Sequence, residues 1–308
     1  MSHAEIVAIW ISANIRMNRT RLTLNISWWN TGVSPPSTKA TSGIFSQEHF
    51  QTLSEIIEVY EADAIGICEV DKSNIDSIST HLQQAYGTKF LIINLYNKSG
   101  NSVDDFCLII NTLKITQAGS PISLNRKVPG YGNHLKAGYL LPLSLLDGTP
   151  LWITVSHWQS RLTYQEENHI RLKLGQTLRS SVETILSQNT DPLIILCGDF
   201  NDEPFSPSIQ ELITSRDMNF VKRRTDTFFN PMWGLMGMND LSHEGIVHGT
   251  YGGTTSYQLT QKLTIDQIMI SPAFLKNGWG FFEAGISVLG HASSADHSPL
   301  VCQLERIS

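Results

Sequence analysis

The sequence predicts an α+β domain in which two β-sheets pack face to face and are covered by helices. The chain contains many short apolar runs of strand length, and segments with helical spacing of apolar residues lie between groups of these runs. Apolar residues make up 41% and charged residues 16% of the 308 residues, a balance typical of a globular protein with a sizeable core. No repeat, low-complexity run or linker divides the chain, so we expect a single domain.

The first predicted unit is a strand, a loop, a helix and a second strand. Polar and apolar residues alternate from Arg21 to Trp28, as they do in a half-buried strand. Residues 32–43 are rich in Pro, Ser, Thr and Gly, which is typical of a loop. From Ser46 to Tyr60 the apolar side chains keep helical spacing, and Ser46 is placed to cap the helix. The run AIGICEV then predicts a buried strand.

The rest of the chain continues this pattern. A helical stretch is expected from Glu166 to Ser187. Residues 1–19 show no counterpart of the pattern, and we expect them to form an N-terminal leader that is disordered or precedes the true start, followed by one domain over residues 20–308. The further predicted strands are KFLIINL, DDFCLIINT, AGYLLPL, LWITVSHW, LIILCGDF, LTIDQIMIS and HSPLVCQL.

Charge and cysteine content narrow the class of protein. The formal net charge is −6 and no cluster of five or more basic residues occurs, which counts against a protein that holds long duplexes by charge alone. A nuclease is still compatible with this charge, because a bound metal supplies positive charge where the reaction needs it. The four cysteines stand in apolar runs without a CxxC pair, which predicts buried free thiols and a reducing compartment.

Targeting signals are weak. The first twenty residues carry Glu5 within a short apolar stretch and fit a signal peptide poorly. No run approaches the roughly 18 consecutive apolar residues of a membrane-spanning helix. We therefore expect a cytoplasmic protein without a transmembrane segment, and the oligomeric state stays open.

Polar residues stand where several of the apolar strands end. A lone Asn or Asp at such a position is usually a turn former, and a lone His is usually a hydrogen-bonded core residue. An ordered set of such residues is harder to explain in this way. The set comprises Asn30, Glu69, His157, Asp199, Asn201, Asp266, Asp296 and His297.

These residues belong to segments that resemble a known signature. The segments are ISWWN, GICEV, SHWQSR, GDFNDEP, GTYGG followed by TIDQIMIS, and SADHSPL. In order and spacing they resemble the endonuclease/exonuclease/phosphatase superfamily, whose fold is DNase I-like. The resemblance spans nearly the whole chain after the first twenty residues. It implies a four-layer αββα sandwich and a metal-dependent phosphoric ester hydrolase.

The resemblance also implies a metal site. Hydrolysis of a phosphodiester brings water in line with the leaving oxygen while charge on the equatorial oxygens is neutralised. A hard cation with oxygen ligands does this, and Mg²⁺, for which Mn²⁺ substitutes, needs only one or two carboxylates. Glu69 is the leading predicted ligand, with Asn30 beside it and Asp296 approaching from the last strand. One metal or two remain possible.

Five residues are assigned catalytic roles by the same resemblance. Asp199 and Asn201, of the GDxN motif, would orient the attacking water and the phosphate. Their separation by one residue predicts that both side chains emerge on the same side of an extended segment. Asp266 would orient His297, which acts as a general base or as a phosphate-binding cation. His157 would donate to the non-bridging phosphate oxygens, and either Asp199 or His297 takes the proton of the water.

Two basic residues are candidates for binding the substrate. Arg161 lies four residues after His157 and offers a forked contact to phosphate, or is an ordinary solvated arginine. Lys136 stands in a segment where relatives often carry an arginine.

The substrate itself stays open at this point, because specificity lies in loops. The leading prediction is a nuclease, endo or exo, that hydrolyses DNA or RNA. The alternatives are a sphingomyelinase-like or inositol-phosphate-type phosphoesterase and an inactive binding protein of the same fold. The basic and aromatic loop over residues 125–134 is a candidate contact for nucleic acid, or an ordinary surface loop. The Met- and Trp-rich loop over residues 228–238 either binds a base, a lipid or a partner, or is a buried flap of the core.

Overall fold

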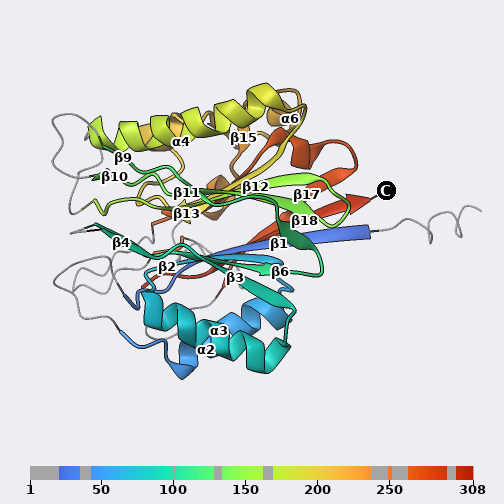
Figure 1. The fold of residues 1–308 in the computed structure, drawn as a ribbon. Helices are drawn as coiled ribbons and strands as arrows, with labels where there is room; N and C mark the ends of the chain where they lie inside the picture. The colour runs from blue at the N-terminus through green and yellow to red at the C-terminus, as the bar shows by residue number, and fades with distance from the viewer. Residues whose placement is uncertain are drawn as a thin grey trace, which may run out of the picture.

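The fold is a sandwich of two β-sheets with helices on both outer faces. The computed structural model describes residues 21–34, 43–99, 102–127, 134–161, 169–236, 249–251, 263–289 and 296–307. Figure 1 shows four layers, with one sheet covered by α2 and α3 and the other by α4. The predicted αββα architecture is therefore confirmed. The expected leader over residues 1–19 lies outside the described residues.

The first sheet has six strands in the order β17-β18-β1-β2-β6-β3. Its central pair, β1 and β2, is parallel and sets Asn30 opposite Cys68, while β18 runs antiparallel to β1. This sheet therefore joins the beginning and the end of the chain. The strands are β1 (Arg21–Asn30), β2 (Ala64–Cys68), β3 (Phe90–Asn94), β6 (Cys107–Asn111), β17 (Trp279–Val288) and β18 (Leu300–Ile307).

The second sheet has eight strands, in the order β14-β15-β16-β13-β12-β11-β7 with β8 paired to β11. Its centre is β13, which is parallel to β12 and antiparallel to β16. The strands are β7 (Ile115–Gln117), β8 (Ile122–Ser123), β11 (Tyr139–Leu145), β12 (Pro150–His157), β13 (Leu193–Asp199), β14 (Thr214–Ser215), β15 (Phe228–Phe229) and β16 (Asp266–Ile270). Two small hairpins lie apart from both sheets, formed by β4 (Asn97–Ser99) with β5 (Ser102–Asp104) and by β9 (Arg126–Lys127) with β10 (His134–Leu135).

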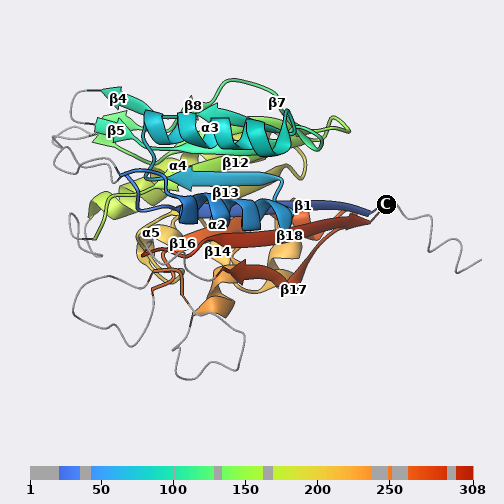
Figure 2. The same ribbon diagram turned by 90° about the horizontal axis from the view of Figure 1, so that it is seen from below.

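Two of the three long helices were predicted from apolar spacing. They are α2 (Gln47–Glu58), preceded by Ser46 as the N-cap residue, and α4 (His169–Gln188), whose expected first turn falls outside the described residues. The third, α3 (Lys72–Tyr86), buries few apolar side chains and begins where Asp71 accepts a hydrogen bond from the backbone N–H of Asn74 at 2.9 Å. Figure 2 shows α2 and α3 lying across the outer face of the first sheet. The shorter helices are α5 (Pro207–Gln210), α6 (Met218–Lys222), η1 (Pro231–Leu235) and η3 (Pro272–Leu275).

Two adjacent tryptophans show how β1 serves two cores. Successive side chains of a strand point to opposite faces. Trp28 therefore enters the apolar core between the sheets, and Trp29 enters the core beneath α2 and α3. Both side chains are fully buried, so truncating either to alanine would cost about 3–5 kcal/mol of stability.

Gly66 makes room for the first of these indoles. It lies opposite Trp28 in the parallel pair of β1 and β2. A Cβ atom at this position would come within 2.8 Å of the Trp28 ring, which is closer than real Cβ contacts. The glycine thus allows the Trp28 ring to pack close against β2, while its indole N–H reaches Asp266 of the second sheet.

Several expectations about individual segments are settled by burial. The four cysteines are buried free thiols, as predicted. In the Met- and Trp-rich loop, most side chains between Phe228 and Met236 are buried, so this part is a flap of the core; residues 237 and 238 lie outside the described residues. Among the described helices, none has the length and apolar character needed to cross a bilayer.

Candidate active site

Strand register brings the predicted residues to one edge of the sandwich. Asn30 ends β1, and Glu69 follows β2, the parallel neighbour of β1. In the second sheet, His157 at the end of β12 pairs with Asp199 at the end of β13, which also pairs with Asp266 at the start of β16. Because both sheets end here, side chains distant in the sequence meet across the gap between the sheets.

Asp266 and His297 form a buried hydrogen-bonded pair. His297 Nδ1 lies 2.7 Å from Asp266 Oδ2, and the indole N–H of Trp28 donates to Asp266 Oδ1 at 3.0 Å. The Thr250 hydroxyl oxygen accepts from the Asp266 backbone N–H at 3.1 Å. Burial alone would lower the pKa of His297, but the carboxylates of Asp266 and Asp199 outweigh it and raise that pKa to about 10. The pair that the sequence predicts is therefore present in the geometry.

His157 has a carboxylate partner that the sequence reasoning missed. Its Nδ1 lies 3.0 Å from Asp105 Oδ2, and its Nε2 lies 3.6 Å from Glu69 Oε1. Burial opposes the charged ring, yet Asp105 and Glu69 raise the pKa of His157 to about 9. Asp105 also accepts from the backbone N–H of Glu69 at 3.2 Å. Asp105 belongs to none of the segments that resemble the family signature, and its role depends on a contact with His157, 52 residues away in the sequence.

Asn30 connects the two sheets at this edge. Its amide Nδ2 donates to Glu69 Oε1 at 3.2 Å and to Asp199 Oδ2 at 3.0 Å. Since the NH₂ group is used in both contacts, the amide oxygen points the other way and accepts from the Gly32 backbone N–H at 3.0 Å. The orientation of Asn30 is thereby determined by its neighbours.

The carboxylates at this edge outnumber the cations. Burial raises the pKa of Glu69, the His157 ring opposes that shift, and Asp105 and Asp199 add to it. Burial and the neighbouring Asp266 also raise the pKa of Asp199, against the effect of His297. Both shifts express the cost of placing several negative charges together in a buried place. A bound cation would relieve that cost.

The donor set fits a hard divalent cation. Asp199, Asp266 and His297 can present ligand atoms within 4.8 Å of one another. Both Asp266 oxygens, however, already accept hydrogen bonds, from Trp28 and His297. The half-buried Glu69 carboxylate is the more accessible oxygen donor, as Mg²⁺ prefers. Asp296 is also half-buried, and its Oδ1 would lie 3.4 Å from a Cβ atom placed on Gly32, two residues after Asn30.

The chain turns sharply within the GDFN segment. Asn201 has a φ of 51°, and its backbone N–H donates to Asp199 Oδ1 at 2.9 Å. The expectation of an extended segment is therefore wrong, and a side-chain-to-backbone turn, which Asp forms readily, brings the two residues together instead. The Asn201 amide Nδ2 donates to the Trp158 carbonyl oxygen at 3.0 Å, which ties this turn to the loop after β12.

A buried arginine, also missed from the sequence, supports the same turn. Arg171 of α4 is fully buried and pairs with Asp202 at 2.7 Å. Its guanidinium also donates to the carbonyl oxygens of Gln159, Phe200 and Asn201 at 2.8 to 3.0 Å. Removing it would leave the buried Asp202 carboxylate with only the longer ionic contact of 3.4 Å to Arg161. Only its place in a helix, with no polar strand end nearby, hid it from the sequence analysis.

The two predicted substrate-binding residues contact backbone carbonyls. Arg161 donates from Nε to the Asn201 carbonyl oxygen at 2.8 Å and lies 3.4 Å from Asp202 Oδ1, with about a quarter of its side chain exposed (26%). Lys136 donates to the Val103 carbonyl oxygen in the β4–β5 hairpin. Both residues border the edge where the catalytic candidates meet, and their contact with substrate stays a prediction.

A family model described as the Endonuclease/Exonuclease/phosphatase family matches residues 35–286. No curated protein sequence matches the chain. Solved structures similar to it include the human Nocturnin catalytic domain with bound sulfate anion, at 18% identity and a TM-score of 0.59 over 95% of this chain and 99% of that one.

Two further similar structures have ligands in the same fold. One is D. rerio TDP2 complexed with single strand DNA product, at 13% identity and a TM-score of 0.56 over 92% of this chain and 98% of that one. The other is ANGEL2, a 2',3'-cyclic phosphatase, in complex with adenosine-2',3'-vanadate, at 13% identity and a TM-score of 0.59 over 94% of this chain and 99% of that one. At these identities the likeness establishes the fold.

Proposed function

Because the chain belongs to the endonuclease/exonuclease/phosphatase family, we propose that it is a Mg²⁺-dependent phosphodiesterase that hydrolyses DNA or RNA. The observation that carries this proposal is the pair of carboxylate–imidazole contacts, Asp266 with His297 and Asp105 with His157, which face Asp199 from two sides. Such pairs are typical of sites that move protons and stabilise developing charge.

The metal would be held by Glu69, Asn30 and Asp296. Bound there, Mg²⁺ would neutralise charge on the phosphate and polarise it toward attack, and Mn²⁺ would substitute. Asn30 must turn its amide oxygen from Gly32 to act as a ligand, because its NH₂ group now faces Glu69 and Asp199. These assignments rest on the donor chemistry and on the family resemblance.

The proton of the attacking water falls to Asp199, with His297 as its cationic neighbour. Asp199 Oδ2 lies 3.8 Å from His297 Nε2 and 4.0 Å from His157 Nε2. Asp266 accepts the hydrogen on Nδ1 of His297, so Nε2 is the atom that faces the reacting water. With its pKa raised to about 10, the His297 ring is charged at neutral pH, so Asp199 accepts the proton of the water and the imidazolium stabilises the charge beside it. Asn201 holds the turn that carries Asp199.

His157 serves the phosphate in this proposal. Its ring is fixed through Nδ1 by Asp105, which leaves Nε2 toward the Glu69 and Asp199 side of the edge. An imidazolium held in this way donates to a non-bridging phosphate oxygen and stabilises charge in the transition state. Arg161 and Lys136 would hold the flanking parts of the substrate.

The structure supports a nucleic-acid substrate over a lipid one. A sphingomyelinase-like enzyme would need an exposed apolar loop for the membrane surface, and the candidate loop is mostly buried between Phe228 and Met236. The reading as an inactive binding protein is disfavoured by the candidate residues themselves, since the whole predicted set is present and its central members are in contact. Hydrolysis remains the function that this geometry serves best.

A substrate panel tests the proposal. Single- and double-stranded DNA, RNA, sphingomyelin, inositol phosphates and a generic phosphodiester are each incubated with the protein in Mg²⁺, Mn²⁺ or EDTA. We expect metal-dependent cleavage of nucleic acid that EDTA abolishes. Preferential cleavage of sphingomyelin or an inositol phosphate would show that this compound, and not nucleic acid, is the substrate class. If no compound in the panel is cleaved, the result would support an inactive binding protein of the same fold.

A further inference from the structure

A small polar hollow lies beside the catalytic edge. It has a volume of about 230 Å³ and is lined by three serines, two asparagines, Asp104 and Lys127. The β4–β5 hairpin and the segment from Ser123 to Lys127 form its walls. Figure 2 shows β4, β5 and β8 gathered at one end of the molecule. None of the residues assigned above to metal binding, catalysis or phosphate contact lines this hollow.

The backbone links this hollow directly to the site. Asp104, on its floor, immediately precedes Asp105, whose carboxylate holds His157. Tyr139 of β11, which hydrogen-bonds Asp104, pairs with Val155 two residues before His157 in β12. The hollow is therefore joined to the His157 position through neighbouring residues on two segments of the chain.

Asp104 orients one asparagine in the hollow. The two Asp104 oxygens both accept from the amide Nδ2 of Asn125 at 3.0 Å, and one also accepts from the Tyr139 hydroxyl at 2.7 Å. A carboxylate only accepts hydrogen bonds, so the amide nitrogen of Asn125 must face Asp104 and its amide oxygen must face elsewhere. That oxygen is buried and has no hydrogen-bond partner among the described residues. An oriented, buried acceptor without a donor indicates a place for a ligand that supplies one.

We propose that this hollow binds the nucleoside attached to the scissile phosphate, an inference that rests on the proposed function. A hydroxyl or amino group of the nucleoside donates to Asn125 Oδ1, and the exposed Lys127 at the rim pairs with a neighbouring phosphate. All of the lining side chains are polar, which suits a sugar or a base edge and disfavours a lipid chain. The volume of 230 Å³ is below the roughly 300–1,000 Å³ of pockets for drug-sized ligands, so it suits one such unit.

The kinetic test compares two phosphodiester substrates, of which only one contains nucleosides. One is a dinucleotide, and the other is bis-nitrophenyl phosphate, which has none. For Asn125→Ala and Lys127→Ala, we expect the KM for the dinucleotide to rise about 10-fold while kcat/KM for bis-nitrophenyl phosphate stays within about 2-fold. Lys98→Ala is the matched control, because Lys98 is an exposed lysine of β4 that does not line the hollow. Equal losses on both substrates, or no loss on either, would overturn the proposal.

A binding measurement separates this proposal from the proposed function. The metal-free full-length protein is titrated with adenosine monophosphate, inositol phosphate and phosphocholine, and the side-chain amide signals of Asn125 are followed by NMR. We expect adenosine monophosphate alone to shift them, and Asn125→Ala to weaken its binding about 10-fold. If the wild type cleaves no substrate yet shows this shift, the proposed hydrolysis fails and the nucleoside site stands. Absence of the shift, or an equal shift with all three ligands, would overturn the nucleoside site.

Discussion

The two ends of the first sheet both bury carboxylates, but they differ in how many carboxylates share each cation. At the end opposite the catalytic edge, Asp63 accepts hydrogen bonds from the Asn25 backbone N–H, the Asn111 amide and the Lys114 ammonium group at 2.9 to 3.0 Å. At the catalytic edge, the carboxylates of Glu69, Asp105, Asp199, Asp266 and Asp296 gather around two histidines. A carboxylate that is paired with a cation stabilises the fold, whereas an excess of buried carboxylates over cations is typical of a functional site.

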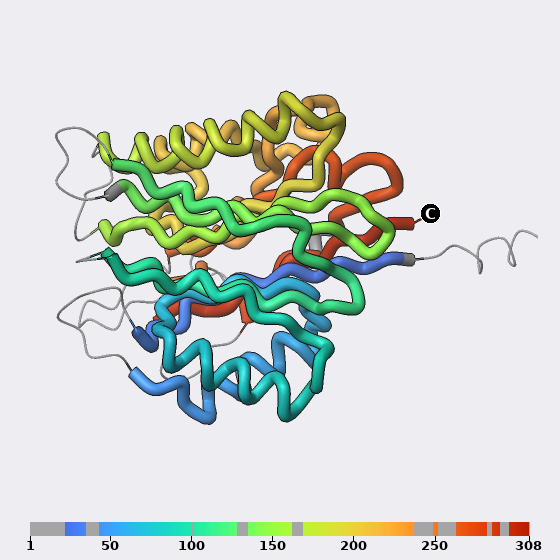
Figure 3. The backbone as a smooth tube through the Cα atoms, in the orientation of Figure 1, coloured from blue at the N-terminus to red at the C-terminus, as the bar shows by residue number. Residues whose placement is uncertain are grey.

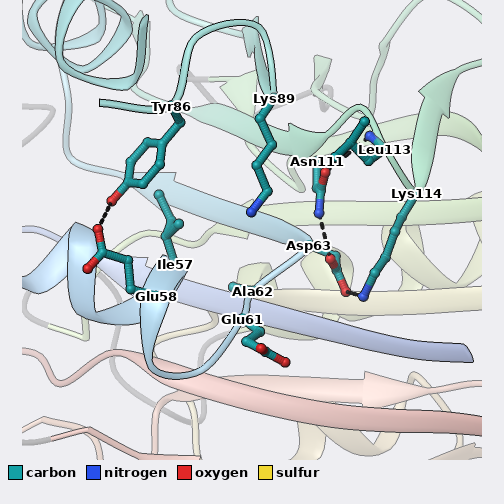
Figure 4. Close-up of a pocket in the computed structure, with 10 residues that line it drawn as sticks. All are labelled: Ile57, Glu58, Glu61, Ala62, Asp63, Tyr86, Lys89, Asn111, Leu113 and Lys114. Atoms are coloured by element: carbon teal, nitrogen blue, oxygen red, sulfur yellow. Dashed lines mark hydrogen bonds and ion pairs between the residues drawn. The ribbon is translucent and has the colours of Figure 1, made fainter. Parts of the chain in front are cut away.

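The volume of a hollow does not distinguish the two ends of the sheet. A hollow of about 500 Å³, more than twice the volume of the polar one beside the site, lies at the Asp63 end, where α2, α3 and the residues after β6 meet. Figure 4 shows Asn111 and Lys114 directed at Asp63, and Tyr86 directed at Glu58. The titratable contacts drawn there are satisfied pairs. The proposed active site lies at the other end, so the volume of a hollow does not locate it.

The sharpest test of the comparison is Glu69→Gln. We expect kcat/KM with Mg²⁺ to fall by about three orders of magnitude, because a leading metal ligand loses its charge. Stability in EDTA should hold or rise. Burial raises the pKa of Glu69, so its ionised form opposes folding at neutral pH and the uncharged amide avoids that cost. Activity and melting temperature are measured on the same samples.

Glu61→Gln is the matched control, since Glu61 is an exposed glutamate on the rim of the opposite hollow. Glu61→Gln should change neither the activity nor the melting temperature. Full activity of Glu69→Gln in limiting metal would remove Glu69 from the metal site.

The next effect in size concerns Asp266 and His297 acting as one unit. Asp266→Asn and His297→Ala should each lower kcat/KM by about 10²–10⁴-fold. The double variant should be little worse than His297→Ala alone, because each residue works through their 2.7 Å contact. A double-mutant cycle at saturating metal measures this. Additive losses would show two independent roles and end the assignment of Asp266 and His297 as one unit.

At the opposite end the expected effect is on stability. Asp63→Asn should lower the free energy of unfolding by about 2 kcal/mol, because the buried backbone N–H of Asn25 and the Lys114 ammonium group lose a charged acceptor. Lys114 is partly exposed and can return to water, which limits the loss. Urea unfolding gives the stability, and kcat/KM at 25 °C should match the wild type. A loss of activity without a loss of stability would contradict the comparison.

The smallest expected effect is at the exposed pair of Asp147 and Arg306. Hydrogen bonds from Thr149 and Arg306 lower the pKa of Asp147 to about 2. A depressed carboxyl pKa adds stability above its unfolded value near 3.9, and this is lost as the pH falls through about 2. The side chain is 42% exposed, so solvent limits the contribution to about 0.5 kcal/mol. Urea unfolding of Asp147→Asn at pH 7 and pH 2 should differ from the wild type only at the higher pH.

Some parts of the molecule were predictable because their signals are local. Alternation and apolar runs identify the central strands, and the polar residues after β2, β12 and β13 mark the edge where they end. The helix α3 was missed because only Ile75, Ile78, Leu82 and the capping Asn74 are buried, too few for a clear period. Local pattern detects an element only when burial imposes a regular apolar face.

The site residues that were missed depend on contacts between distant segments. Asp105 pairs with His157, and Arg171 pairs with Asp202. No local sequence pattern around Asp105 or Arg171 predicts these pairs. The turn at Asn201 also followed from the hydrogen bond that Asp199 accepts, which overrides the extended geometry expected after a strand. Sequence spacing identifies candidate side chains, and the tertiary fold decides which of them meet.

The hydrogen bond between Trp28 and Asp266 has a consequence for the order of folding events. The two residues are 238 positions apart, and Asn30 and Asp199 are 169 apart. Figure 3 shows the start of β1 and the end of β18 at the same end of the molecule, and these first and last described strands are neighbours inside the first sheet. Contacts of such sequence separation close slowly, because the chain entropy is lost before they form. During synthesis the Asp266–His297 pair cannot form before residue 297 has left the ribosome, and on refolding the proposed activity should return after helical structure.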